Sequence, residues 1–210
     1  MPQNKVKQIQ GLFKHRLVLR FLFSKLRYTG IHIIPYYLTQ ESLNVKTRPT
    51  VSPELGAVAV SVLSPTELAA VYSELESKGL AVSRPILAKH SCECFVLKIK
   101  DEIVASSWCN LQQCHDRLSS FPLKQDEAYL CNAGTMDSYR GKNLAPFLRY
   151  AFYEHLNRIG RTKLYSITEY FNTPAVKFKE KLGARQLKLG LCIRFLNRWR
   201  WDITLRRNVD

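Results

Sequence analysis

The residues best suited to chemistry lie in one short basic stretch, residues 139–145, with the sequence YRGKNLA. Residues 128–135 before it are apolar and typical of a strand, and residues 144–159 after it have the spacing of an amphipathic helix. A turn that leads from a strand into a helix presents several free backbone N–H groups, and the helix dipole adds positive potential at the same place. The stretch therefore predicts a site for an anion.

The side chains of this stretch favour a phosphate or pyrophosphate ligand. Arg140 and Lys142 supply positive charge. Gly141 can adopt backbone angles that other residues resist, and Ala145 is small enough for a ligand to approach the backbone. An ordinary strand-to-helix connection with surface charges would contain the same residues, so the stretch alone leaves both interpretations open.

A second segment, residues 172–184 (NTPAVKFKEKLGA), has the signals of a short capped helix. Asn172 is a favourable N-cap, Pro174 fits the first turn, and Gly183 fits the left-handed position after the last turn. By itself this segment predicts only a helix.

The two segments together resemble the GNAT superfamily of acyl-CoA-dependent N-acyltransferases, over about residues 57–196. The pyrophosphate motif of that family is Gln or Arg, two residues, Gly, one residue, and Gly or Ala. Arg140, Asn143 and Ala145 match it, and Asn143 in place of the usual Gly is a mild departure because asparagine tolerates positive φ. The family's second motif is matched by Asn172, Ala175, Phe178, Leu182 and Gly183, with Ala184 in place of Phe.

The resemblance implies acetyl-CoA, or another acyl-CoA, as co-substrate, and no metal. In the family two parallel strands part and the acyl-CoA lies between them; here these strands would be residues 128–135 and 163–168. A β-bulge at Gly134 would turn a backbone N–H toward the thioester oxygen, where it would stabilise the oxyanion. The implied cofactor contacts are the pantetheine-binding Ala133, Gly134, Thr135, Asn172 and Phe178 and the pyrophosphate-binding Arg140, Gly141, Lys142, Asn143, Leu144 and Ala145.

The resemblance also suggests where a catalytic base would stand. The acceptor amine must be neutral to attack, so the family commonly uses a base on the strand before the pyrophosphate turn. Tyr129 stands at about that position, and Glu127 lies two residues earlier on the same face of the strand. We expect Glu127 to be the base, because the tyrosine would need a strongly shifted pKa, although a solvated strand end explains Glu127 equally well. Glu169 is a second candidate.

The usual general acid of the family is a tyrosine one residue after the aromatic residue of the second motif, and Lys179 stands there in this chain. Either the thiolate leaves without an acid, or Tyr165 or Tyr170 supplies the proton. The sequence leaves these alternatives open.

Charge and composition restrict the partners. The chain has 210 residues, 46% of them hydrophobic, which is enough for one domain with a sizeable core. Its formal net charge is +15, and residues 1–40 contain no acidic residue.

Residues 5–27 have amphipathic helical spacing, typical of a helix docked on the domain, of a membrane-surface helix or, more weakly, of a targeting presequence. An anionic membrane surface and an acidic carrier protein are therefore candidate partners of residues 1–27; nucleic acid is disfavoured, because charge is its only support.

The six cysteines lie mostly in apolar strand-like runs, which is typical of reduced, buried thiols in the cytoplasm. Cys92 and Cys94 have Cys-x-Cys spacing instead of the zinc-type Cys-x-x-Cys, so we expect no metal site. No apolar run has the length of a membrane-spanning helix and no signal peptide is visible, so we expect a cytoplasmic protein that can also lie at the inner membrane surface.

The expected fold is α/β (α+β): a single GNAT-like domain whose mixed, mostly antiparallel sheet has a splayed central parallel strand pair and helices on both faces, plus an extra basic N-terminal helix. We expect residues 1–45 to contain that helix and an extra strand, and residues 46–210 to form the acyltransferase domain. The other expected strands are residues 31–38, 57–63, 92–100, 103–111, 185–189 and 191–196; residues 64–78 form a helix, residues 114–126 a polar loop, and residues from Trp199 onward a tail.

These observations favour an N-acyltransferase, with acetyl as the preferred group, that moves the acyl group from acyl-CoA to an amine by direct attack in a ternary complex. The alternatives are a basic membrane-surface or nucleic-acid-binding protein built on a GNAT-like scaffold, and an acyltransferase whose donor is an acyl carrier protein. The resemblance does not identify the amine, so amino sugars, peptide amines, polyamines and antibiotics all stay open.

Overall fold

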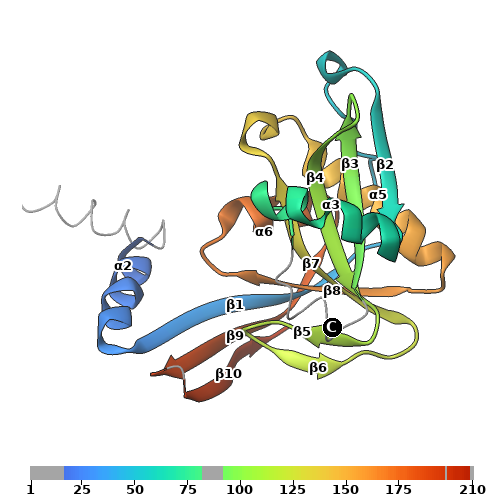
Figure 1. Ribbon diagram of the computed structural model, residues 1–210. Coiled ribbons are helices and arrows are strands. Elements are labelled where there is room, and N and C mark those ends of the chain that lie inside the picture. The colour runs from blue at the N-terminus through green and yellow to red at the C-terminus, as the bar shows by residue number, and fades with distance from the viewer. Residues whose placement is uncertain (1–16, 82–91, 197, 209–210) are drawn as a thin grey trace, which may run out of the picture.

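The computed structural model describes residues 17–81, 92–196 and 198–208. One eight-stranded sheet has the order β10-β9-β1-β8-β7-β4-β3-β2, and β5 and β6 form a separate small sheet (Figure 1). The strands are β1 (Ile31–Glu41), β2 (Val58–Leu63), β3 (Cys92–Ile99), β4 (Glu102–Asn110), β5 (Gln113–His115), β6 (Ser120–Pro122), β7 (Glu127–Thr135), β8 (Lys163–Glu169), β9 (Arg185–Phe195) and β10 (Trp199–Arg207). The α-helices are α2 (Leu17–Leu26), α3 (Pro65–Ser77), α5 (Leu144–Arg158) and α6 (Thr173–Lys181).

Helices cover both faces of the sheet, as expected. On one face, Leu68 and Tyr72 of α3 pack in a cluster with Trp108 of β4. On the other, Phe152 of α5 packs in a cluster with Cys109 of the same strand. Because neighbouring residues of a strand point to opposite faces, the two helices enclose the sheet between them.

β7 and β8 form the parallel pair that the sequence predicts. They pair from Glu127–Lys163 to Leu130–Ser166, although β7 continues to Thr135 and β8 to Glu169. The two strands therefore part in the middle of the sheet, and the gap opens toward the end of β7 that leads into the turn at residues 139–145.

β1 lies between β8 and β9 and pairs antiparallel with both. It thus shares the sheet with the strands that follow residue 45, and the division of the chain at that residue stays a prediction. Of the helix expected over residues 5–27, α2 accounts for Leu17–Leu26, and residues 5–16 lie outside the described residues. In the part of the chain that the structure describes, no helix has the length and apolarity that crossing a membrane requires.

The predicted loop at residues 114–126 is wrong in part, because it contains the hairpin of β5 and β6. Asp116 closes its turn: its backbone N–H donates to the Ser119 carbonyl at 3.0 Å, and its Oδ1 accepts from the Leu118 N–H at 2.8 Å. The predicted tail is also wrong, because β10 pairs with β9. The signal for β10 was present in the alternation of apolar and polar residues from Trp199 to Leu205.

The predicted break between residues 189 and 191 is wrong as well, because β9 runs through Gly190. A glycine inside a strand marks a turn or a close approach of another group, and here it is the second. A Cβ on Gly190 would lie 2.5 Å from the Tyr36 ring, so the glycine leaves room for that buried tyrosine.

We expect Gly190→Ala to lower the free energy of unfolding by about 1–3 kcal/mol, because the added methyl group overpacks the Tyr36 ring. Urea titration followed by tryptophan fluorescence measures the change. Ser61→Ala, at an exposed position of β2, is the control and should change stability little. Equal stability of Gly190→Ala and wild type would contradict the close approach.

Candidate active site

The turn that leads into α5 has the backbone geometry of an anion site. Gly141 has φ 80° and Asn143 has φ 63°, so both adopt the left-handed conformation. Asn143 thus takes the conformation for which the family motif uses Gly, and its Nδ2 donates to the Thr50 carbonyl at 2.6 Å. The first backbone hydrogen bond of the helix runs from the Phe147 N–H to the Asn143 carbonyl. Within the described residues, the N–H groups of residues 141–145 therefore have no backbone acceptor and are free for a ligand.

The end of β7 that does not pair with β8 lines a cavity of about 420 Å³ beside this turn. Ala133, Gly134 and Thr135 form one wall together with Arg140, and Leu80, after α3, lies on the other. The structure thus brings together four of the predicted cofactor contacts, from β7 to the start of the turn.

The bulge predicted at Gly134 is wrong in position. Gly134 pairs regularly with Ser106, and the ladder shifts between that pair and Trp108–Cys131, where Asn132 has φ 43°. A Cβ on Gly134 would lie 2.9 Å from Leu80 Cδ2, so this glycine lets the Leu80 side chain lie close to the backbone of β7. The bulge therefore precedes Gly134, and a backbone irregularity still lies on the open arm of β7.

A buried charged cluster lies where the two strands part. It consists of Glu41 of β1, Arg149 of α5 and Lys179 of α6, all of them buried. Glu41 Oε2 lies 3.2 Å from Arg149 Nε, and Glu41 Oε1 lies 3.8 Å from Lys179 Nζ. The Tyr153 hydroxyl also donates to Glu41 Oε2. Burial alone would raise the pKa of Glu41, but the charges of Arg149 and Lys179 and hydrogen bonds with Ser166 and Tyr153 together lower it, so the carboxylate stays charged.

Lys179 reaches from α6 to the edge of the gap. Its Nζ donates to Ser166 Oγ at 2.8 Å and to Thr168 Oγ1 at 2.5 Å. Ser166 is the last residue of β8 that pairs with β7, and Thr168 lies on the open arm. Burial lowers the pKa of Lys179 to about 8, with Arg149 acting in the same direction and Glu41 opposing it. A lysine in this state can release a proton near neutral pH.

The two bases predicted from the sequence lie on the paired part of β7. Glu127 is buried, so the solvated alternative is wrong; its carboxylate accepts hydrogen bonds from the Lys124 N–H at 2.9 Å and the Tyr165 hydroxyl at 3.2 Å. Tyr129 donates to Asp116 Oδ2 at 2.9 Å, and burial, reinforced by Asp116, raises its pKa well above the usual range. Both side chains thus have structural partners away from the open arms of the strands.

The predicted contacts in the second motif lie on α6. Asn172 Oδ1 accepts from the Ala175 N–H at 3.3 Å and caps the helix. Phe178 packs on the core, and the Arg149 guanidinium lies 6.0 Å from its ring centroid. Phe178 therefore adjoins the charged cluster, one residue before Lys179.

The sequence analysis missed Glu41 and Arg149 as members of this site. A faint signal was present, because Ser166 and Thr168 place hydroxyl groups at alternate positions of β8, on the face where Leu164 is also buried. Polar side chains on the buried face of a strand indicate a polar partner across from them. The position of Glu41 was not readable, because it depends on the pairing of β1 with β8.

The cysteines of the protein are buried or partly buried. The six cysteines are free thiols, and burial raises the pKa of Cys94 to about 12. Among residues 17–81, 92–196 and 198–208, no three His, Cys, Asp or Glu side chains gather in a group that could hold a metal ion.

Comparison with known proteins agrees with this geometry. Residues 63–184 match the model of the acetyltransferase (GNAT) family. No curated protein matches the chain. Similar solved structures include a GCN5-related N-acetyltransferase from Kribbella flavida, with a TM-score of 0.54, 15% identity, and 81% of this chain and 62% of that chain covered. They also include a GCN5-related N-acetyltransferase-like protein from Streptococcus suis, with a TM-score of 0.52 and 13% identity. That match covers 84% of this chain and 67% of the Streptococcus suis chain.

A conserved protein of unknown function from Staphylococcus epidermidis has the same fold, with a TM-score of 0.53, 12% identity, and 83% of this chain and 66% of that chain covered. The chain therefore spans about two thirds or less of the length of these solved chains. At such identities the structures show the fold alone, whereas the family model covers more than half of the chain. The chain belongs to the GNAT acetyltransferase family, whose members transfer acyl groups from acyl-CoA.

Proposed function

We propose that this protein transfers an acyl group, preferably acetyl, from acyl-CoA to an amine by direct attack in a ternary complex. Two observations support the proposal: the gap between β7 and β8, and the cavity that Ala133, Gly134, Thr135 and Arg140 line at the end of β7. Pantetheine would pair with that backbone, and the pyrophosphate would lie on the free N–H groups of residues 141–145, with Arg140 and Lys142 adding charge.

In the proposed reaction, the nitrogen of a neutral amine attacks the thioester carbon. The C–N bond forms, the C–S bond breaks, and the electron pair of that bond leaves on sulfur. A backbone N–H on the open arm of β7 stabilises the oxyanion, and the proton of the amine passes to a base or to water.

The geometry favours Glu169 over Glu127 as the carboxylate next to the amine. Glu169 ends β8, three residues beyond the last parallel pair, where its partly exposed carboxylate forms an ion pair with Arg117. Glu127 lies at the other, paired end of the two strands, where its carboxylate accepts hydrogen bonds from Lys124 and Tyr165.

Lys179 is the proposed proton donor to the departing thiolate, in place of the tyrosine that the family commonly uses. Its Nζ is bound by the hydroxyls of Ser166 and Thr168 at the start of the gap. Tyr165, an alternative donor, has its hydroxyl committed to Glu127. The groups that set the charge state of Lys179 are Glu41, Arg149 and Asp116, and burial outweighs the two carboxylates.

This role predicts a pH dependence. A general acid must be protonated, so kcat should fall as the pH rises through the Lys179 pKa of about 8. Lys179→Met should lower kcat by about 10²-fold, which is the lower end of the range for general acid catalysis because a thiolate leaves readily. It should also remove the fall of kcat at alkaline pH, which is the basic limb of the pH profile. Steady-state rates from pH 6 to 10 measure both effects. Lys181→Met, on the exposed side of α6, is the control, and a basic limb that persists in Lys179→Met would contradict the role.

The acyl transfer itself is tested with acetyl-CoA and a panel of amines, by following the release of free CoA thiol. Calorimetry with acetyl-CoA alone gives the cofactor half of the answer. A folded sample that binds no acyl-CoA would overturn the proposal and leave an acyl carrier protein as the donor to examine.

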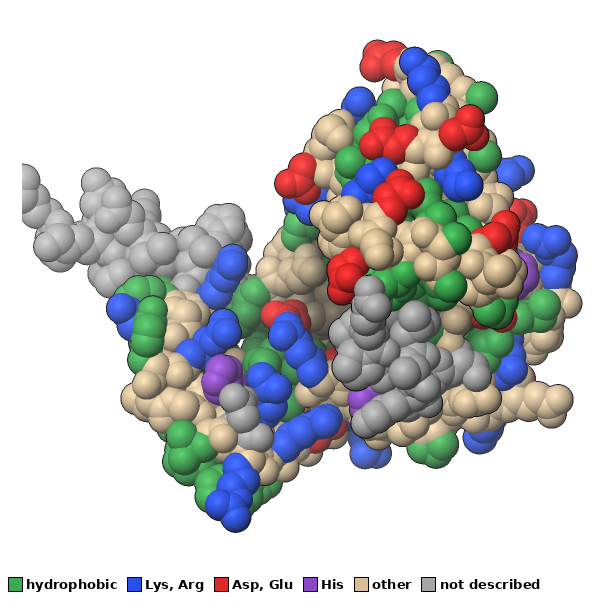
Figure 2. Space-filling view, viewed as in Figure 1, with side chains coloured by type: hydrophobic (Ala, Val, Ile, Leu, Met, Phe, Trp, Pro, Cys, Tyr) green, Lys and Arg blue, Asp and Glu red, His purple; other side chains and the backbone are tan. Residues whose placement is uncertain are grey.

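We propose in addition that the protein lies at an anionic membrane surface through α2. Leu19, Phe21 and Leu22 of this helix are exposed, and so are the neighbouring Arg20 and Lys25. Figure 2 shows Lys and Arg side chains gathered on the same side of the molecule. Exposed apolar groups among cations are typical of interfacial helices. Co-sedimentation with anionic vesicles should therefore be lost in Phe21→Glu, and binding that is unchanged in this variant would contradict the location.

A further inference from the structure

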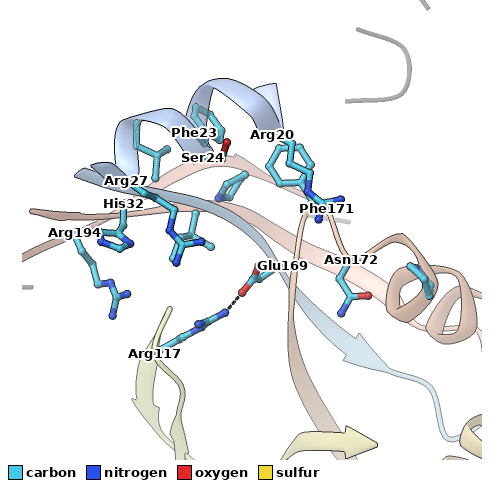
Figure 3. A pocket seen from close by; sticks show the side chains of 14 residues that line it. Arg20, Phe23, Ser24, Arg27, His32, Arg117, Glu169, Phe171, Asn172 and Arg194 are labelled. Atoms are coloured by element: carbon cyan, nitrogen blue, oxygen red, sulfur yellow. Dashed lines mark hydrogen bonds and ion pairs between the residues drawn. The ribbon is translucent and has the colours of Figure 1, made fainter. Parts of the chain in front are cut away.

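A second cavity, of about 510 Å³, lies between α2, β1 and the loop that follows β8. Figure 3 shows Arg27 and Arg194 on one side of it, Arg117 beside Glu169, and Arg20 beside Phe171. Its volume is that of a site for a small molecule. Four arginines in one small cavity is a concentration of positive charge that the proposed acyl-CoA seat does not use.

The positive charge is only partly compensated. Arg117 forms an ion pair with Glu169, the one acidic residue among the described residues that line the cavity. Within the described part of the chain, Arg20, Arg27 and Arg194 have no acidic partner, and Arg194 Nε is buried without a hydrogen-bond acceptor. A buried guanidinium nitrogen with no acceptor is costly unless a ligand supplies one. The cavity therefore fits a ligand with an anionic group.

The end of the cavity opposite Arg194 adjoins the proposed reaction centre. Glu169 and Asn172 line it, and they follow the open arm of β8, the strand that parts from β7. In Figure 3, Arg194 and Asn172 lie at opposite ends with Glu169 between them. A carboxylate at this place can hold an ammonium group and accept its proton, whereas the arginines cannot.

We propose that this cavity is the acceptor site, and that it takes a small primary amine whose other end carries a phosphate or carboxylate group. The proposal rests on the proposed acyl transfer, because it places the amine beside the thioester. Arg27 and Arg194, on the side away from Asn172, bind the anionic group, for which their planar guanidinium groups are suited. Phe23 and Phe171, whose ring centroids are 6.2 Å apart, contact the carbon chain between the two ends.

The first test is calorimetry on the full chain saturated with CoA, which occupies the cofactor seat. Phosphoethanolamine is compared with ethanolamine, and β-alanine with propylamine, so that each pair differs in the anionic group. In each pair, we expect the amine that carries an anionic group to bind at least about tenfold more tightly than the amine that lacks it, as a charge-assisted contact predicts. Equal affinities within both pairs would overturn the proposal.

The second test removes single charges from the cavity. Arg194→Gln should abolish the preference for the anionic amines, and it should fold because the replaced cation has no acidic partner in the described structure. Arg27→Gln, at an exposed position, gives the same answer if Arg194→Gln does not fold. Arg158→Gln, at the far end of α5, removes the same charge outside the cavity and should keep the preference. A preference that survives in Arg194→Gln and in Arg27→Gln would refute the site.

The ligand could come from a lipid headgroup or from a free metabolite, and the rates of transfer to the two forms of acceptor distinguish these sources. Faster transfer to vesicles containing phosphatidylethanolamine than to soluble phosphoethanolamine indicates a lipid headgroup, and the reverse order indicates a free metabolite. Either order supports the shared chemistry, provided that Arg194→Gln slows the transfer. If acetyl-CoA does not bind at all, the acyl-transfer proposal fails. The same titrations without CoA then still decide whether the cavity takes an anionic amine.

Discussion

Replacing Glu41 with glutamine should lower the free energy of unfolding by about 3–5 kcal/mol, the range for breaking a buried ion pair from one side. Glu41 has no exposed side-chain surface, and it faces both Arg149 and Lys179. Glutamine fills the same space but leaves two buried cations without a counter-charge. Thermal and urea unfolding of the purified variant measure the loss.

Two further variants show whether the loss comes from charge. Glu169→Gln makes the same substitution in the partly exposed Glu169–Arg117 pair and should cost less than about 1 kcal/mol. Glu41→Gln combined with Lys179→Met removes one of the two stranded cations and should recover part of the stability. If the double variant is no more stable than Glu41→Gln alone, the buried charges are not the cause.

The same cluster sets the response to acid. The folded-state pKa of Glu41 lies below its unfolded value, because Arg149 and Lys179, with the hydrogen bonds of Ser166 and Tyr153, together outweigh the effect of burial. Its contribution to stability is therefore complete above the unfolded carboxyl pKa and is lost as the pH falls through the folded one. Wild type should lose more stability on acidification than Glu41→Gln does, which thermal unfolding between pH 3 and 7 would show.

Short-range signals carried most of what the sequence predicted. The capping box of α3 follows from Ser64 and Glu67, and both of its hydrogen bonds are present. The left-handed conformation of Asn143 follows from its place in the family motif. The parting of β7 and β8 was expected from the resemblance, because two motifs at a fixed separation define the strands between them.

Long-range pairing could not be read in the same way. β1 lies between β8 and β9, more than a hundred residues away in sequence, and only this pairing brings Glu41 under the gap. Gly190 predicted a break because its partner, the Tyr36 ring, is equally distant. The arginines of the second cavity come from α2, from the 3-10 turn after it (Arg27–Thr29), from the β5–β6 hairpin and from β9, so no local pattern marks them as one site.

Ala145→Glu should weaken acetyl-CoA binding by at least about 10²-fold, because a like charge against a phosphate costs several kcal/mol. Ala145 is the second residue of α5, where the free N–H groups of the turn and the helix dipole converge. A carboxylate there would accept those N–H groups itself, as an N-terminal acidic residue does, so the fold should be kept and even slightly stabilised. The prediction thus combines a large loss of affinity with an unchanged or higher melting temperature.

Ala70→Glu provides the matched control, because it makes the same substitution at an exposed position of α3 and should leave acetyl-CoA affinity unchanged. Calorimetry gives the affinities, and thermal unfolding without ligand gives the stabilities. Acetyl-CoA also stabilises the folded state in proportion to its affinity, so the rise in melting temperature that it produces in wild type should disappear in Ala145→Glu. Equal affinity of Ala145→Glu and Ala70→Glu would show that the pyrophosphate does not lie on this turn, and the donor would then have to bind elsewhere along the open arms of β7 and β8.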